Sequence, residues 1–105
     1  MAHPQIAAFA RLADGATEAV RKIEGQKAGL GRTMHSIIYD PLHDEISVPQ
    51  DFACAILTFR GGATGEEPPI RILQGPKTQL NGPERHTVDF VHNEIFVPES
   101  DRILV

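Results

Sequence analysis

The sequence DPLHDEISVP at Asp40–Pro49 returns 49 residues later as DFVHNEIFVP at Asp89–Pro98, with six of the ten positions identical. Weaker matches extend the repeat: Ala63-Thr64-Gly65 corresponds to Ala13-Asp14-Gly15 at an offset of 50 residues. A period near 50 residues, built from short apolar segments, is typical of propellers and solenoids. The chain has 105 residues and therefore holds about two repeats.

Each repeat is predicted to contain four short antiparallel strands, because β-branched and aromatic segments alternate with turn residues. The complete set, in chain order, is Ser36–Asp40, Glu45–Val48, Ala55–Phe59 and Ile70–Leu73. Partial copies are Ile6–Phe9 and Val20–Ile23 before it, and Arg85–Asp89, Glu94–Val97 and Ile103–Val105 after it. Residues 5–24 also carry apolar residues near helical spacing. The repeat favours strands there, and Gly15 would weaken a helix by about 1 kcal/mol relative to Ala.

Composition excludes several classes of protein. The net charge is −4 and no basic run is present, so no nucleic acid partner is expected. No apolar run is long enough to span a bilayer, so no membrane partner is expected either. The chain carries no signal-peptide pattern and is predicted to be cytoplasmic as it stands. Cys54 is the only cysteine and is expected to be a small buried apolar residue.

A set of residues in the complete repeat carries a resemblance that extends, through the partial copies, over nearly the whole chain. Its members are Asp40, His43-Asp44-Glu45-Ile46, Val48-Pro49, Ala55–Arg60, Gly65, Pro69–Pro76, Thr78 and Leu80. This set resembles bacterial β-propeller repeats of the NHL type. The resemblance implies blades of four antiparallel strands, with the first strand nearest a central channel. Two departures from the family pattern are present: Met34 stands where the other copy has Pro83, and the turn after Pro49 is two residues longer in the first copy.

The resemblance also implies how the chain is divided and assembled. Residues 1–105 would form one repeat domain, in which 1–34 hold the third and fourth strands of a shared blade. Residues 35–80 would form a complete blade, and 81–105 the first to third strands of the next. Propellers carry about four to eight blades, so either the chain is a piece of a longer propeller or copies assemble. A cyclic homo-trimer with about six blades is the preferred prediction, in which the partner is the protein itself.

One feature of this assembly stays open. Ile103–Val105 and Ile6–Phe9 both resemble the third strand of a blade. The sequence does not decide which of the two is used in the shared blade.

Four histidines are candidate site residues. His43 and His92 stand beside carboxylates in the turn between the first and second strands, an arrangement that could bind a divalent metal. The structural interpretation is favoured: Asp40 accepts backbone N–H groups in that turn, as its counterpart Asp89 does, and the histidines hydrogen-bond across blades. Two further histidines, near the inner strands, either face a central channel or are ordinary buried or rim residues; these are His35 and His86.

Two sets of charged residues are expected to be structural. Arg21 and Arg71 recur in the fourth strand and are predicted to pair with an acid on a neighbouring blade, such as Glu45 or Glu94. Glu66-Glu67 is predicted to be solvated at a turn. The serines lack a nucleophile-elbow context.

The function predicted from these features is a non-enzymatic, self-assembling β-propeller module that acts as a scaffold or binding surface. No catalytic residue, cofactor or metal is expected, and the nature of any small-molecule or protein ligand is left open. One alternative is a metal-dependent propeller hydrolase or lyase with a central-channel site. Another is a protein-interaction fragment of a larger propeller protein, which rests on analogy of fold alone.

Overall fold

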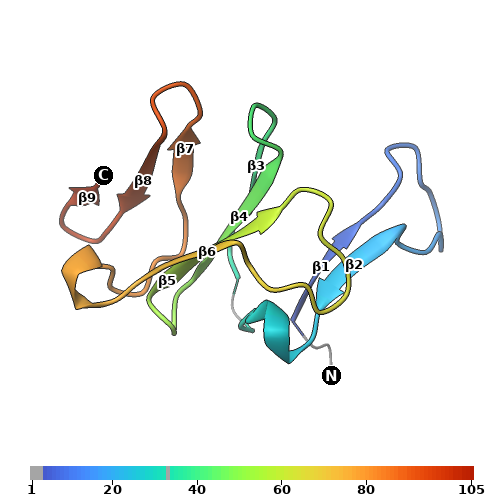
Figure 1. The fold of residues 1–105 in the computed structure, drawn as a ribbon, viewed down its shortest axis with the longest axis horizontal. Helices are drawn as coiled ribbons and strands as arrows, with labels where there is room; N and C mark the ends of the chain where they lie inside the picture. Colours follow the sequence, from blue (N-terminus) through green and yellow to red (C-terminus); the bar gives the residue numbers. More distant parts are fainter. Residues whose placement is uncertain (1–3, 33) are drawn as a thin grey trace.

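The computed structural model describes residues 4–32 and 34–105, and nine short strands lie in them (Figure 1). The strands are β1 (Gln5–Ala8), β2 (Arg21–Glu24), β3 (Ile38–Asp40), β4 (Glu45–Gln50), β5 (Ala55–Arg60), β6 (Arg71–Gln74), β7 (Thr87–Asp89), β8 (Glu94–Pro98) and β9 (Ile103–Leu104). Two 3-10 turns follow β2 and β6, η1 (Gln26–Ala28) and η2 (Pro76–Thr78). No helix in the described part of the chain is long and apolar enough to cross a membrane.

The strands form three antiparallel sheets, in the orders β1-β2, β3-β4-β5-β6 and β7-β8-β9. We call these the first, second and third sheets. They fall within residues 1–34, 35–80 and 81–105 respectively. Their registers repeat: Ile38 lies opposite Ser47, and at the equivalent positions of the next repeat Thr87 lies opposite Phe96. The predicted all-β class with antiparallel sheets is confirmed.

Every predicted strand is present, with ends that differ by at most two residues. The helical alternative for residues 5–24 is wrong, because Ile6 of β1 pairs with Ile23 of β2 in an antiparallel ladder. The prediction ended the second strand at Val48, whereas β4 runs through Pro49 to Gln50. Proline is tolerated there because β3 pairs only with residues 45–47, so Pro49 lies beyond the stretch of β4 that is bonded on both sides.

The repeat also appears in the backbone conformation. Asp44 and Asn93, at equivalent positions of two hairpin turns, have positive φ angles of 54° and 57°. Asp and Asn adopt this left-handed conformation more readily than other residues with a Cβ. Gly25 and Gly75 precede η1 and η2 with φ of 99° and 120°, a region that side chains rarely permit. The repeated turn residues therefore set where the strands end.

The first and second sheets are joined by hydrogen bonds and by the main apolar core. The N–H of Glu24 donates to the carbonyl of Gly65 at 2.9 Å, and the N–H of Gly65 donates back to Lys22 at 2.7 Å. The core beside these bonds consists of Ile23, Ala28, Ala55, Leu57, Phe59 and Ala63. Burial of this cluster holds the two sheets together.

The third sheet stands next to the second, with β7 beside β3 (Figure 1). Val48, Pro49, Ile56 and Pro83 are among the most deeply buried side chains. The chain measures 42 × 33 × 23 Å, and its radius of gyration of 14.2 Å exceeds the value of about 13 Å typical of a compact domain of this length. The sheets thus stand in a row.

Candidate functional site

The β3–β4 and β7–β8 hairpins contain the same Asp–His turn. Oδ1 of Asp40 accepts the backbone N–H groups of Leu42 and His43 at 2.9 and 3.1 Å. Its Oδ2 lies 2.6 Å from Nδ1 of His43. Asp89 makes the same three bonds in the next repeat, at 3.0, 3.1 and 2.7 Å, the last with His92. The expectation that both aspartates accept backbone N–H groups is confirmed.

These turns account for the repeated histidines without a metal ion. Nδ1 of His43 and of His92 is bonded to the aspartate of its own turn, so the predicted partner on a neighbouring blade is wrong for these nitrogens. Burial favours the neutral form of Asp40, but the bonds from His43 and Leu42 outweigh it and lower the pKa of the carboxyl. For Asp89, the hydrogen bonds from His92 are the main cause of a lowered pKa.

His86 bridges the second and third sheets. Its Nε2 lies 2.6 Å from Oγ of Ser47 in β4, and its Nδ1 lies 3.4 Å from Oγ of Ser36. The residue is only 7% exposed, and burial lowers the pKa of its imidazole. Of the two possibilities left by the sequence, the buried histidine is the one observed in this chain.

The contact between Ser47 and His86 has the distance of a nucleophile and its general base. Its surroundings do not favour that chemistry. Both residues are buried, Ser47 lies in the middle of a strand, and the second ring nitrogen faces the hydroxyl of Ser36 instead of a carboxylate. We interpret the contact as a polar link between sheets.

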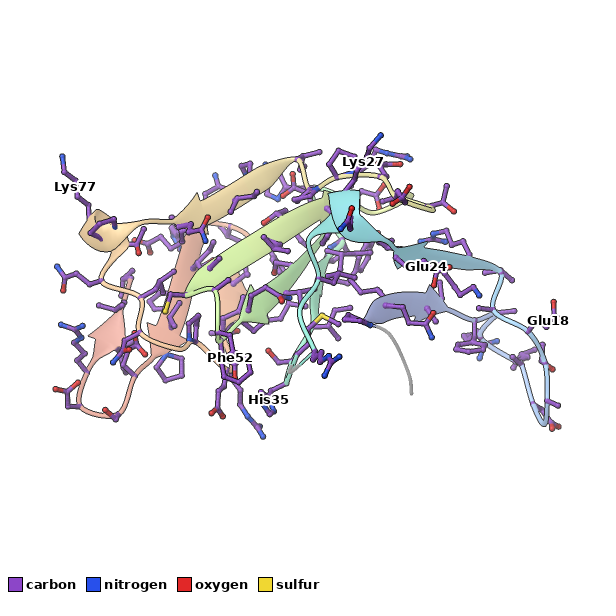
Figure 2. All side chains as sticks on the ribbon, turned by 90° about the horizontal axis from the view of Figure 1, so that it is seen from below. Glu18, Glu24, Lys27, His35, Phe52 and Lys77 are labelled. Carbon is purple, nitrogen blue, oxygen red and sulfur yellow. The ribbon has the colours of Figure 1, made fainter. Side chains whose placement is uncertain are left out.

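His35 lies at the edge of the molecule, with 44% of its side chain exposed, at the same end as Phe52 (Figure 2). Its Nε2 is 3.8 Å from Oδ2 of Asp51, and both lie near the carboxylate of Glu84. One ligand atom from each of the three residues lies within 4.8 Å of the others. This arrangement could hold a metal ion. The sequence indicated His35 alone, because β5 and β6 separate the two acids along the chain and no local spacing connects them.

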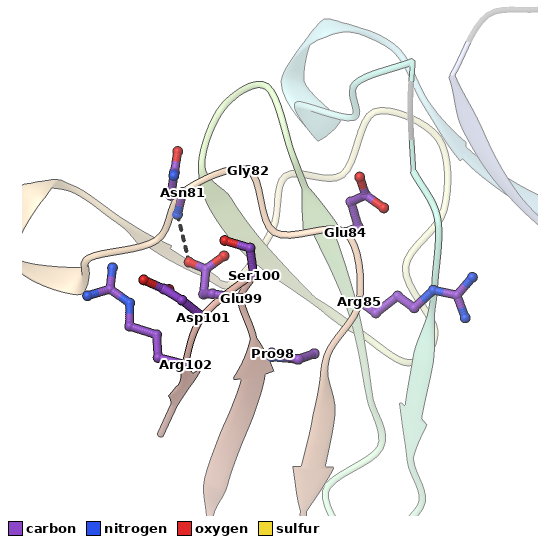
Figure 3. Close-up of a pocket in the computed structure, with 9 residues that line it drawn as sticks. All are labelled: Asn81, Gly82, Glu84, Arg85, Pro98, Glu99, Ser100, Asp101 and Arg102. Carbon is purple, nitrogen blue, oxygen red and sulfur yellow. Dashed lines mark hydrogen bonds between the residues drawn. The ribbon is translucent and has the colours of Figure 1, made fainter.

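Two hollows are lined mainly by charged and polar residues. One of about 360 Å³ separates the β6–β7 connection from the β8–β9 turn (Figure 3). It is lined by Asn81, Gly82, Glu84, Arg85, Pro98, Glu99, Ser100, Asp101 and Arg102. Oε1 of Glu99 accepts the N–H of Asn81 there, at 2.9 Å. The other, of about 340 Å³, lies between the second and third sheets and is lined by Asp40, His43, Glu45, Ser47, Thr58, Arg71, Val88, Asn93 and Ile95. Neither was foreseen, since each combines residues from separate hairpins.

Of the two recurring arginines, Arg71 binds one of the predicted acids, but on its own sheet, and Arg21 binds a backbone carbonyl instead of an acid. Arg71 in β6 binds Glu45 in β4 through two bonds of 2.5 and 3.0 Å. Glu45 was a predicted partner, but it belongs to the same sheet as Arg71, so the neighbouring-blade pairing is wrong. Arg21 reaches a different sheet and donates to the carbonyl of Gly61 at 2.6 Å.

Two further predictions need correction. Glu67 is not simply solvated, because Arg60 donates two bonds of 2.8 Å to its carboxylate; its neighbour Glu66 is exposed. Cys54 is partly exposed and lies in a turn with φ of 50°. Its Sγ accepts the N–H of Gly82 at 3.4 Å, so its role is to connect two loops.

Comparisons with protein-family models, with curated proteins and with solved structures give no significant match for this chain. The fold and the sites above therefore rest on the residues themselves.

Proposed function

We propose that this chain is a self-assembling β-propeller module of the NHL type, and that it acts as a non-enzymatic scaffold or binding surface. The second sheet supports this proposal, since four antiparallel strands in sequential order are the form of a propeller blade. The flanking sheets, with two and three strands, are shorter versions of the same unit.

The observation that supports the proposal is a pair of exposed apolar side chains whose repeat equivalents are buried. Ile23 of β2 packs with Phe59 of the second sheet in the buried core. The repeat equivalent of Ile23 is Leu73, which is 42% exposed, and the equivalent of Phe59 is Phe9, which is 56% exposed. Each therefore lacks the neighbour that its equivalent has. A second copy that places Phe9 against Leu73 supplies both contacts with the geometry already used inside the chain.

This docking also completes the unfinished sheets. β1 and β2 of one copy correspond to the third and fourth strands of the repeat, and β7 and β8 of the next copy correspond to the first and second. We propose that β1 pairs with β8 of the neighbouring copy and displaces β9, which has only two residues. The interface is heterologous, so it must close into a ring or continue as a filament. Three copies give six four-stranded blades.

A scaffold role agrees with the chemistry of the described residues. Asp40 and Asp89 are held inside their turns, and His86 is buried between sheets. The ring faces would present the polar hairpin turns and hollows to a binding partner. The alternative of a metal-dependent enzyme is favoured by one observation, the proximity of His35, Asp51 and Glu84.

The test is the solution mass, measured by light scattering after size exclusion at two concentrations. We expect a sharp species with three times the mass of the 11.5 kDa chain. Phe9→Ser should weaken each interface roughly 10- to 100-fold, because burying a Phe side chain contributes about 1.5–3 kcal/mol. Phe52→Ser is the matched control, since Phe52 is 85% exposed in the β4–β5 turn, away from the proposed contact.

A monomer at both concentrations would refute self-assembly. A discrete oligomer that is unchanged by Phe9→Ser would refute the proposed interface.

A further inference from the structure

We propose that His35, Asp51 and Glu84 form a binding site for a divalent transition-metal ion, with Zn²⁺ the best match. One imidazole nitrogen and two carboxylate oxygens lie within 4.8 Å of one another. Zinc accepts both ligand types, and three protein ligands leave a position for water or for a ligand atom. The hard ions Mg²⁺ and Ca²⁺ prefer oxygen ligands throughout, so the histidine favours a transition metal.

The distances are close to those of a bound site. Ligands held tetrahedrally at about 2.0–2.2 Å from zinc lie about 3.3–3.6 Å apart. The separation of His35 Nε2 and Asp51 Oδ2 is already 3.8 Å. Glu84 lies within 4.8 Å of both other ligands. Bringing it to that spacing needs a side-chain movement of about 1 Å, which the exposed His35 and Glu84 can make without disturbing the core.

The carboxylate of Asp51 is oriented by its own turn. Its Oδ1 accepts the N–H of Phe52 at 2.9 Å, and Oδ2 is the atom nearest His35. The backbone carbonyl of Asp51 accepts the N–H of Cys54 at 3.2 Å. Bonds of this kind hold a ligand in position before the ion arrives.

The other two ligands come from separate connections. His35 lies between η1 and β3, and Glu84 lies between η2 and β7. Glu84 follows Pro83, which is fully buried, and precedes the buried His86 by two residues, so its backbone is fixed on both sides. Figure 3 shows the Glu84 side chain pointing away from the β8–β9 turn. A bound ion would therefore tie the second sheet to the third.

The site lies within one chain and does not require the assembly proposed above. One consequence alone rests on that assembly. In the ring, β3 and β7 are the innermost strands, and three such ions would lie at the mouth of the channel.

The experiment is calorimetric titration of ZnCl₂ into the full chain at pH 7, with thermal unfolding measured with and without the ion. We expect one ion bound per chain and a higher melting temperature in its presence. His35→Ala and Glu84→Gln should each weaken binding at least tenfold and abolish the thermal shift. Both residues are exposed, so the variants should keep the melting temperature of the metal-free protein.

Two controls separate this site from other zinc ligands. His92→Ala removes an exposed histidine that contacts a single carboxylate, and binding should be unchanged. Cys54→Ser removes the nearby thiol, and binding should again persist. The proposal is overturned if zinc does not bind at millimolar concentration, if the His35 and Glu84 variants bind like the original chain, or if binding is lost with Cys54. Because a monomer can be titrated, failure of the ring proposal would not affect this result.

Discussion

Substitution of Phe59 by alanine tests whether the first and second sheets are packed as one body. Phe59 has 0% exposure and lies in the core cluster with Ile23 and Leu57. Removing the ring loses its transfer free energy and leaves a cavity, which together cost about 3–5 kcal/mol for Phe→Ala in protein cores. Two cluster neighbours, Ala28 and Ala63, are fixed by the backbone and cannot fill the space. We therefore expect a loss of about 4–5 kcal/mol, a large share of the about 5–15 kcal/mol typical of whole domains.

The assay is urea unfolding followed by circular dichroism, at concentrations low enough that the chain is monomeric. Phe9→Ala is the matched control, because Phe9 is the repeat equivalent of Phe59 and is 56% exposed. Its substitution should cost less than about 1 kcal/mol in the monomer. Similar losses for the two variants, or a loss below about 1 kcal/mol for Phe59→Ala, would show that the two sheets do not share this core.

Two further predictions concern the aspartates of the repeated turns and the histidine between the sheets. Asp40→Ala should lower the urea midpoint more than Asp89→Ala, because both carboxylates accept the same three bonds but their side chains are 11% and 32% exposed; equal shifts would refute this ranking. Burial lowers the pKa of the His86 imidazole in the folded chain below its ordinary value of 6.5. As the pH falls below about 6.5, the imidazole is therefore protonated more readily in the unfolded chain than in the folded one, and the free energy of unfolding should decrease. Urea midpoints between pH 5 and 8 should show this slope, and His86→Gln should remove it. The lowered pKa values of Asp40 and Asp89 act only at more acid pH, below about their ordinary value of 3.8, and do not overlap this window.

The strands and turns could be predicted because the signals that set them are local. The hairpin Asp40–Pro49 contains its own aspartate acceptor, its own left-handed residue at Asp44 and its own paired strands. All these interactions join residues that are close together in the chain, so a copy of the sequence at Asp89–Pro98 reproduces them. This is why the repeat predicted the strands and the turns of the second and third sheets.

The candidate sites were harder to predict, because they depend on which sheet stands beside which. The histidine and two acids of the proposed metal site come from three connections that meet only when the second and third sheets pack. Arg71 was expected to bind an acid on a neighbouring blade, but it binds Glu45 on its own sheet. Strand pattern does not specify such distances between side chains.

The sequence by itself determined the all-β class, the three strand groups and the positions of their turns, because the hydrogen bonds and backbone preferences that set them involve residues close together within each repeat. Only the tertiary structure decided which copy of a repeated residue is buried. Phe59 and Phe9 occupy equivalent positions, but one is covered by a neighbouring sheet and the other is not. Burial depends on which residues pack against a side chain. Two copies of a repeat have the same local sequence, so that sequence does not specify the neighbour of each copy.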